Sequence, residues 1–423
     1  MAQIVAVPLP PLDEHSLLVF WCQILVVLAV ARVGGSAARR IGQPRVIGEL
    51  LGGVVIGSSV FGRIWPSGFD WLFPASERQA GLLLGLAWIG IVFLLGTTGA
   101  EVDLSTIRRQ GRAAATTTIG SITVPLGVGA LVAWQLPTEF AGDAATGAVF
   151  IAFFAVAFAI SSLPVATRIL RDLGLLERPF AQLAIGVATA NDVIGWLLLG
   201  VVVGIAESGV FDVGPLLTAT GAIVAAVLLV IKLAPPLLDR TASVVEQRSG
   251  GTAAEVSLIA FTVVAVGTIT HAVGIEVVIG AFLAGIAIGR TRLRSSQGLR
   301  SIESVTHGFF APMFFVIAGI RVDLSVLATQ SVAMWCVVVT LAAIAAKLLG
   351  SYFGGRIGGL IRRDALAVGA SLNARGALEI VVATVGLSLG VIDNIAYTII
   401  VVMALVTTAL AGPLLQFVST PDP

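Results

Sequence analysis

The chain has 423 residues, of which 57% are hydrophobic and 12% charged, and its formal net charge is +1. A soluble domain carries roughly a quarter of its residues as charged side chains, so this composition excludes a water-soluble protein and predicts one that resides in lipid. The near-neutral charge gives no reason to expect nucleic acid as a partner.

Thirteen apolar stretches have the length that a membrane-spanning helix needs, which is about 20 mostly apolar residues. In chain order they fall near residues 16–33, 45–61, 80–98, 113–135, 145–170, 180–206, 213–236, 253–272, 274–290, 305–320, 330–355, 364–388 and 391–417. The predicted fold class is therefore an all-α polytopic membrane protein of about thirteen transmembrane helices. The N-terminus has no basic residue before its first apolar run, so we expect no cleaved signal peptide.

Arginine gathers in alternate loops of this map, and cytoplasmic loops are the ones that collect Arg and Lys. With the N-terminus outside, the cytoplasmic loops hold Arg39, Arg40, Arg45, Arg108, Arg109, Arg112, Arg168, Arg171, Arg178, Arg240, Arg248, Arg290, Arg292, Arg294, Arg300, Arg356, Arg362 and Arg363. The opposite loops hold only Arg63, Arg78 and Arg321. We therefore predict a multi-pass protein of the cell inner (plasma) membrane, with its N-terminus outside and its C-terminus in the cytoplasm.

Two segments repeat each other in distant parts of the chain. IGELLGGVVIG (Ile47–Gly57) matches IGAFLAGIAIG (Ile279–Gly289), and GAEVDLS (Gly99–Ser105) matches GIRVDLS (Gly319–Ser325). The members of each pair are separated by seven spans, an odd number, so the two halves must lie in the membrane with opposite orientation. Inverted-topology repeats are typical of secondary transporters that work by alternating access, with the site near the midplane.

Four ionisable side chains lie deep within predicted spans, where a charge costs at least about 2.5–3.5 kcal/mol and therefore demands a reason. They are Asp192, Lys347, Arg375 and Glu379. Four others lie nearer to span ends, and we interpret them as interfacial anchors: Glu49, Glu255, Glu276 and Lys232.

Asp192 lies about halfway along the span 180–206, with Asn191 beside it. A carboxylate can bind a proton or a dehydrated alkali cation, but not both at once, and this competition is enough to couple the two fluxes. Asn191 offers the ion a carbonyl oxygen, or offers an amide that holds the neighbouring helices. The alternative is a static Asp192 paired with Lys347 or Arg375. Lys347 is either a participant in the proton cycle or a fixed counter-charge to Asp192.

The fifth and twelfth spans are interrupted by polar residues. The fifth carries Ser161, Ser162 and Pro164, and a proline removes a helix hydrogen bond and frees a carbonyl. The twelfth carries SLNARGALE, whose polar and flexible residues are Asn373, Arg375, Gly376 and Glu379. Paired interruptions in two halves indicate a binding site, where freed carbonyls and hydroxyls can coordinate a cation. Arg375 and Glu379 stand four residues apart, so for them we favour a mutual ion pair.

Seven stretches are similar to those of a known family. They are GQPRVIGELLGGVVIG, LLGTTGAEVDL, SSLPVATRILRDLGLL, ATANDVIGW, APMFFVIAGIRVDL, AAKLLGSYFGGRIGG and SLNARGALEIVV. Together they resemble the membrane domain of the monovalent cation:proton antiporter-2 family, which has the sodium/hydrogen exchanger fold. That family includes Kef-type potassium efflux proteins and plant cation/H+ exchangers, and the resemblance covers nearly all thirteen spans.

The resemblance implies a homodimer built from a scaffold and a moving core. The scaffold and dimer contact would be residues 1–112 and 251–328, the core 113–206 and 329–423, and a linker helix 207–250. The resemblance also marks Asp192 as the ion-carrying carboxylate and Lys347 as the core lysine, with Ser161 and Ser162 at the helix break.

The chain departs from the family in two respects. Many members have two aspartates where this chain has Asn191 and Asp192. With one carboxylate fewer, we expect exchange of one cation per proton, which is indifferent to the roughly 2.3 kcal/mol per charge that 100 mV supplies. Lys347 still offers a second route for a proton. Kef-type members also carry a nucleotide-binding domain that this sequence lacks, so we do not expect gating by nucleotide.

The sequence therefore predicts a secondary antiporter that exchanges Na+ or K+ for H+ by elevator-like alternating access, with Asp192 as the metal-ion ligand and no cofactor. We do not expect an enzyme, because no nucleophile–histidine pairing or metal-ligand cluster lies at membrane depth. Two alternatives remain. A cation channel of the same architecture needs a continuous polar pathway, and a symporter for an organic solute explains the broken helices but not a lone Asp192 beside Lys347.

Overall fold

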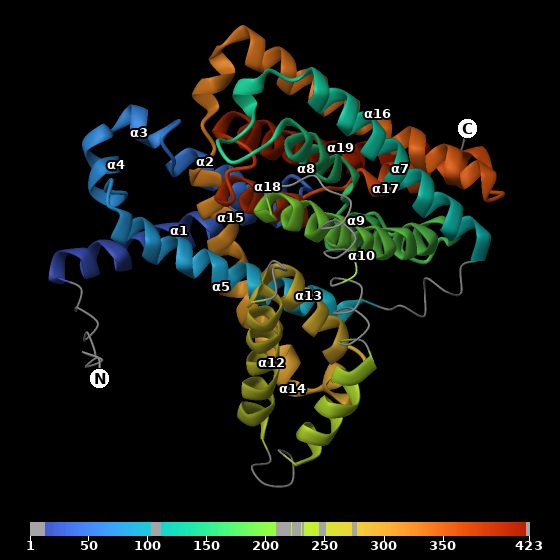
Figure 1. The fold of residues 1–423 in the computed structure, drawn as a ribbon, viewed down its shortest axis with the longest axis horizontal. Helices are drawn as coiled ribbons and strands as arrows, with labels where there is room; N and C mark the ends of the chain where they lie inside the picture. Colours follow the sequence, from blue (N-terminus) through green and yellow to red (C-terminus); the bar gives the residue numbers. More distant parts are fainter. Residues whose placement is uncertain are drawn as a thin grey trace.

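The computed structural model describes residues 13–102, 111–208, 221, 230, 232–244, 251–272 and 277–419. Every named element in this part of the chain is a helix, as the composition predicts (Figure 1). The first half contains α1 (Glu14–Arg40), α2 (Arg45–Ile56), α3 (Phe61–Ile64), α4 (Pro66–Leu72), α5 (Glu77–Glu101), α7 (Gly111–Gln135), η1 (Thr138–Phe140), α8 (Gly147–Ala159), α9 (Leu163–Asp172) and α10 (Pro179–Ser208). The second half contains α12 (Thr252–Ala272), α13 (Val277–Ile288), η2 (Arg292–Ser295), α14 (Gln297–Val305), η3 (Thr306–Phe310), α15 (Ala311–Ile320), η4 (Leu324–Ala328), α16 (Gln330–Ile357), α17 (Arg362–Leu372), α18 (Ala377–Ser388) and α19 (Asn394–Ser419).

Nine helical segments of the described chain are long and apolar enough to cross a bilayer, and α8, α13 and α18 are shorter apolar helices. The predicted spans 145–170 and 364–388 each consist of two helices, α8 with α9 and α17 with α18, so the predicted interruptions are present. The predicted span 213–236 lies largely outside the described residues, as does most of the predicted linker at 207–250. Also outside them are Arg108, Arg109, Arg248, Glu276 and the end of the first GAEVDLS repeat.

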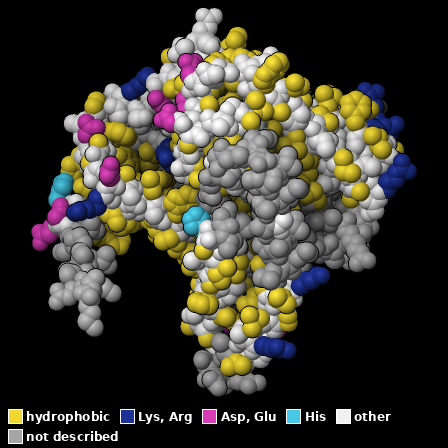
Figure 2. Space-filling view, in the orientation of Figure 1, with side chains coloured by type: hydrophobic (Ala, Val, Ile, Leu, Met, Phe, Trp, Pro, Cys, Tyr) yellow, Lys and Arg dark blue, Asp and Glu magenta, His cyan; other side chains and the backbone are white. Residues whose placement is uncertain are grey.

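The outer surface of the helices is largely apolar. Figure 2 shows hydrophobic side chains spread over the described part of one face, with charged side chains gathered mainly near its edges. Trp134 is 74% exposed and Phe261 is 72% exposed. Large apolar side chains in such positions suit lipid, rather than water, as the surrounding medium.

The helices pack in two groups; in Figure 1 the first occupies the upper right of the view, and the second extends from the left to the bottom. In one group α7 lies along α16, with α8, α9, α10, α17, α18 and α19 beside them. The other group comprises α1, α2, α5, α12, α13, α14 and α15. The groups meet where α18 contacts α15, α10 contacts α13, and α19 contacts α2.

The duplicated segments make corresponding contacts within the second group. The first copy lies in α2, which packs on α15, and the second lies in α13, which packs on α5. A Cβ atom at Gly53 of α2 would lie 2.9 Å from the Cα of Gly319 at the end of α15, and one at Gly285 of α13 would lie 2.9 Å from the Cα of Gly99 in α5. Real Cβ atoms do not approach so closely, so both helix crossings require glycine.

The helix of the predicted span 305–320 begins earlier than its apolar run. It starts with α14 at Gln297 and continues through the π-helical turn η3 into α15. The α14 sequence QGLRSIESV is mostly polar and buries Leu299 and Ile302, so an apolar run does not reveal it. Similarly, the helix of the predicted span 45–61 ends at Ile56, where a turn leads to the short α3.

Candidate ion-binding site

Two broken helices meet inside the group formed by α7–α10 and α16–α19. The chain leaves the helix at residues 160–162, between α8 and α9, and at residues 373–376, between α17 and α18. The backbone N–H of Ser162 donates to the carbonyl of Ala374 at 3.1 Å, so the two breaks are in direct contact. Each break leaves backbone groups at helix ends without intrahelical partners, and side chains or an ion can satisfy them.

Pro164 and Gly376 lie where the chain re-enters a helix after each break, at the starts of α9 and α18. Pro164 lies in the first turn of α9, where its missing N–H is one that a helix start leaves unpaired in any case. The interruption thus begins at Ile160, four residues before the proline. Gly376 has φ +150° and ψ −117°, a conformation that side-chain-bearing residues rarely adopt, and it turns the chain into α18.

Asp192 and Asn191 lie on α10 and are each 1% exposed. Neither carboxylate oxygen of Asp192 makes a hydrogen bond with any described residue. The backbone N–H of Leu163, at the start of α9, acts on this carboxylate electrostatically without reaching hydrogen-bond geometry. Because a buried charge without partners is unfavourable, this position suits a group that takes up a proton or a cation.

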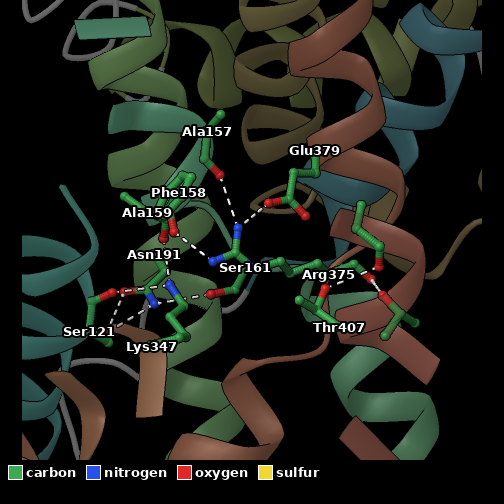
Figure 3. Close-up of polar contacts among 12 residues, drawn as sticks. Ser121, Ala157, Phe158, Ala159, Ser161, Asn191, Lys347, Arg375, Glu379 and Thr407 are labelled. Atoms are coloured by element: carbon green, nitrogen blue, oxygen red, sulfur yellow. Dashed lines mark hydrogen bonds and ion pairs between the residues drawn. The ribbon is translucent and has the colours of Figure 1, made fainter. Parts of the chain in front are cut away.

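Asn191 connects three elements. Its Nδ2 donates to Ser121 Oγ of α7 at 3.0 Å and to Ser161 Oγ, in the break after α8, at 3.4 Å. Ser121 Oγ also lies 3.2 Å from Asn191 Oδ1, to which it can donate. These bonds, drawn in Figure 3, are those expected of an amide that holds the neighbouring helices.

Lys347 of α16 is fully buried. Its Nζ donates to the carbonyl of Ser121 at 3.0 Å and to that of Ala159, the last residue of α8, at 2.5 Å. Lys347 acts on Asp192 through space, but neither Asp192 oxygen contacts Lys347 or Arg375 as a hydrogen-bond partner. The alternative of a static Asp192 held in a direct pair with either cation is therefore not what the structure has.

Arg375 and Glu379 form a buried ion pair, which confirms the predicted pairing. Figure 3 shows the Arg375 guanidinium between this carboxylate and the end of α8. Its Nη1 donates to the Ala157 carbonyl at 3.1 Å and its Nη2 to the Phe158 carbonyl at 2.8 Å. Together with Lys347, it satisfies the last three carbonyls of α8, where a positive charge is favoured by the helix dipole.

Within the two breaks, residues 160–162 and 373–376, two further side-chain oxygens are buried without a hydrogen-bond partner among the described residues, Ser162 Oγ and Asn373 Oδ1. The Nδ2 of Asn373 donates to the carbonyl of Ile344 at 3.5 Å and to that of Gly369 at 3.4 Å, so this side chain is held between α16 and α17. Of the predicted residues, the hydrogen bonds and electrostatic contacts bring together around the α8–α9 break Asp192, Asn191, Ser161, Ser162 and Lys347.

Ser121 and Thr408 are functional residues that the sequence patterns above do not predict. Ser121 contacts both Asn191 and Lys347, while Thr408 Oγ1 donates to the Arg375 carbonyl at 2.6 Å and so fixes the second break to α19. Ser121 and Thr408 are 0% and 2% exposed. The sequence feature that indicates such residues is a serine or threonine within an apolar span, as in TTTIGSITVP.

Comparison with known proteins gives a consistent result along the chain. The family described as "Sodium/hydrogen exchanger, transmembrane" matches residues 25–420. A Na(+)/H(+) antiporter of Synechocystis, NhaS4, is 29% identical over 405 residues, which cover 95% of this chain and 98% of that one. The K(+)/H(+) antiporter 1 of Saccharomyces cerevisiae is 30% identical over 94% of this chain, and the chain spans 46% of its length. Cation/H(+) antiporter 18 of Arabidopsis thaliana is 29% identical, and 49% of it is covered.

A solved structure has the same fold. The sodium proton antiporter MjNhaP1 of Methanocaldococcus jannaschii superposes with a TM-score of 0.60, covering 96% of this chain and all of the other. The two sequences are 18% identical. This likeness extends over the α7–α10 and α16–α19 group as well as the group that contains α1, α2 and α5.

Proposed function

The chain belongs to the sodium/hydrogen exchanger family of multi-pass membrane transporters, and on that premise we propose that it exchanges a monovalent cation, Na+ or K+, for H+. Membership of this family confirms the resemblance seen in the sequence motifs. The relatives named above as Na(+)/H(+) and K(+)/H(+) antiporters support the exchange and differ in the cation, so we propose monovalent cations as a class.

The observation that carries the proposal is the Asp192 carboxylate, buried with both oxygens unpaired among the described residues. Its two oxygen atoms are therefore free to bind one positively charged species. A proton satisfies it by forming the neutral acid, and a dehydrated alkali ion satisfies it by coordination. Ser161 and Ser162 hydroxyls, and the carbonyls freed at the break, would supply neutral oxygen ligands to the ion. The two substrates exclude each other at one site, and this exclusion couples their fluxes.

The charges of the site favour exchange of one cation for one proton. Lys347 and Arg375 carry two positive charges, and Asp192 and Glu379 carry two negative charges when ionised, so the group sums to zero. Adding a proton or a monovalent cation brings the sum to +1 in either case. The loaded site then carries the same charge in both directions, and we propose that the exchange is electroneutral. In this scheme Lys347 is a fixed charge that holds the end of α8.

We propose that alternating access results from movement of one helix group against the other. Residues 113–206 and 329–423 would form the moving core, and residues 1–112 and 251–328 a scaffold that also makes a homodimer. Support comes from the corresponding glycine crossings of α2 with α15 and of α13 with α5, which are the arrangement that inverted repeats produce. The arginine distribution supports a plasma-membrane protein with its N-terminus outside.

The test is exchange by the purified full-length protein in liposomes that contain a pH-sensitive dye. A pH gradient is imposed, and Na+, K+ or Li+ is then added outside. We expect at least one cation to dissipate the gradient, and Asp192→Asn to abolish this effect. Asp70→Asn, which changes an exposed aspartate on α4, is the matched control and should exchange like the wild type.

The same vesicles distinguish the alternatives. Exchange that persists in Asp192→Asn would contradict the shared-carboxylate mechanism, and cation flux that ignores the pH gradient would indicate a channel. Clamping the membrane potential tests the stoichiometry. One-for-one exchange is unaffected by a 100 mV step, whereas moving one net charge would change the driving force by about 2.3 kcal/mol.

A further inference from the structure

A pocket lies apart from the ion-binding site, between α1, α2 and the π-helical turn η3. It has a volume of about 270 Å³. Pockets that bind small ligands have volumes of roughly 300–1,000 Å³, and the volume of this pocket lies just below that range. It can therefore hold a small polar group, but not a whole lipid or cofactor. Its charged and polar lining residues are Arg32, Ser36, Arg39, Arg45, Glu49 and His307.

The pocket carries a net positive charge. The pocket contains three arginines and one carboxylate, that of Glu49, which is 8% exposed and lies beside Gly35 of α1. Arg45 and Glu49 already interact with other groups. The Arg32 and Arg39 side chains, by contrast, form no hydrogen bond or ion pair with any residue in the described ranges. Two guanidinium groups are thus available to an anion.

The position of Arg32 along α1 sets the depth of the pocket. It precedes the last residue of the helix by eight positions, a distance of about 12 Å at the α-helical rise, whereas Arg39 lies in the last turn. A charge this far into a spanning helix needs a counter-charge or a polar neighbour. The deeper end of the pocket is lined by Leu28 and Phe309, so it is polar towards the helix end and apolar towards the bilayer.

This order of polarity matches a phospholipid. Its phosphate would lie between the arginine side chains, and the start of its acyl chains would lie against Leu28 and Phe309. A free phosphate ion would leave the apolar end of the pocket unused. Basic pockets between transmembrane helices on the cytoplasmic side are known to bind the head groups of anionic lipids, and the arginine distribution places this end of α1 on that side.

We propose that this pocket binds the phosphate group of an anionic phospholipid, with Arg32 and Arg39 as its principal ligands. The site is formed by α1, α2 and η3 and does not depend on the ion carried by Asp192. The net positive charge of the pocket favours an anionic lipid over a zwitterionic one, because the latter brings no net charge to offset it.

The test is a lipid titration of the purified, delipidated full chain, followed by native mass spectrometry. The probes are phosphatidylglycerol, phosphatidylcholine and inorganic phosphate. We expect phosphatidylglycerol to bind, and the double variant Arg32→Gln/Arg39→Gln to bind it about 30-fold more weakly, since each arginine near an anionic head group contributes about fivefold. The matched control Arg40→Gln/Arg362→Gln removes two exposed arginines outside the pocket and should change binding less than about twofold.

A second variant separates the pocket from general surface charge. Ser36→Phe fills the cavity and leaves all arginines in place, and we expect it to abolish retention of phosphatidylglycerol. The proposal is overturned if the double arginine variant binds phosphatidylglycerol like the wild type, if Ser36→Phe does so, or if phosphatidylcholine binds equally well. Binding of inorganic phosphate alone, with lipid binding indifferent to the arginines, would also overturn the assignment to a lipid.

Discussion

Replacing Glu379 with glutamine is expected to destabilise the protein strongly. Glu379 is 1% exposed, and its partner Arg375 is fully buried. Removing one member of a buried ion pair leaves the other charge uncompensated and typically costs about 3–5 kcal/mol. Because no hydrogen bond joins Glu379 to Asp192 in the described part of the chain, the loss should affect mainly folding, and the affinity for the transported cation only through the summed charge of the site.

The companion variant Arg375→Met should be more severe. It leaves Glu379 as an unpaired buried carboxylate and removes the donors to the Ala157 and Phe158 carbonyls. Each buried carbonyl without a donor adds about 1–3 kcal/mol to a pair loss of about 3–5 kcal/mol. The double variant Arg375→Met/Glu379→Gln has lost both charges, so it should be more stable than Arg375→Met alone, although still less stable than the wild type.

The assay is thermal melting of the detergent-purified variants, followed by size-exclusion chromatography. Arg362→Gln, which removes an exposed arginine at the start of α17, is the control and should lie within about 0.5 kcal/mol of the wild type. A Glu379→Gln variant that has the melting temperature of the wild type but fails to exchange cations would contradict the assignment of Glu379 to a mainly structural role. A double variant less stable than Arg375→Met would contradict it as well.

Three other substitutions test the site and its surroundings. Ser121→Ala removes the hydroxyl that holds the α10 asparagine, a bond of about 0.5–1.5 kcal/mol, so the cation concentration for half-maximal exchange should rise about 2- to 13-fold; an unchanged value would remove Ser121 from the site. Gly376→Ala forces a side chain into φ +150° and should lower the melting temperature by the equivalent of about 1–3 kcal/mol, whereas Gly81→Ala in open space on α5 should not lower it. Burial raises the pKa of Asp393, so the folded state holds the proton more tightly than the unfolded state. Stability therefore falls as the pH rises from the pKa of this group in the unfolded chain to its pKa in the folded protein. Asp393→Asn keeps the acceptor for the Ala396 N–H, and its stability advantage over the wild type should therefore grow from pH 4 to pH 7 in thermal melts; a constant difference would contradict this assignment.

The helix breaks and the buried carboxylate can be predicted from the sequence. Backbone polar groups must be satisfied within a bilayer, so polar and flexible residues such as Ser162 and Gly376 in an apolar run indicate where the helix stops. An ionisable residue amid such a run faces the interior of the helix bundle. Asp192 is buried for this reason. The pairing of Arg375 with Glu379 also follows from the sequence, because residues four apart share a helical face.

The contacts between helices that are distant in the sequence cannot be predicted in this way. Sequence spacing does not determine which neighbouring helix a side chain faces, because rotation of a helix about its own axis is set by packing. Packing of α16 along α7 turns Lys347 towards the Ser121 and Ala159 carbonyls instead of into a direct pair with Asp192. The polar helix α14 was missed for a different reason, since hydropathy reports apolar runs and not amphipathic helices.

The capped end of α8 has a consequence for how the transporter operates. Its last three carbonyls are held by Arg375 and Lys347, which come from the other half of the chain. Any displacement that keeps these bonds must carry α8, α16 and the junction of α17 with α18 as a single rigid block. The oxygen atoms around Asp192 would then keep the same spacing at both membrane surfaces and bind the cation equally well at each. The gradients of the two ions set the direction of exchange, and equal affinity at the two surfaces would give similar half-saturating cation concentrations for transport in either direction.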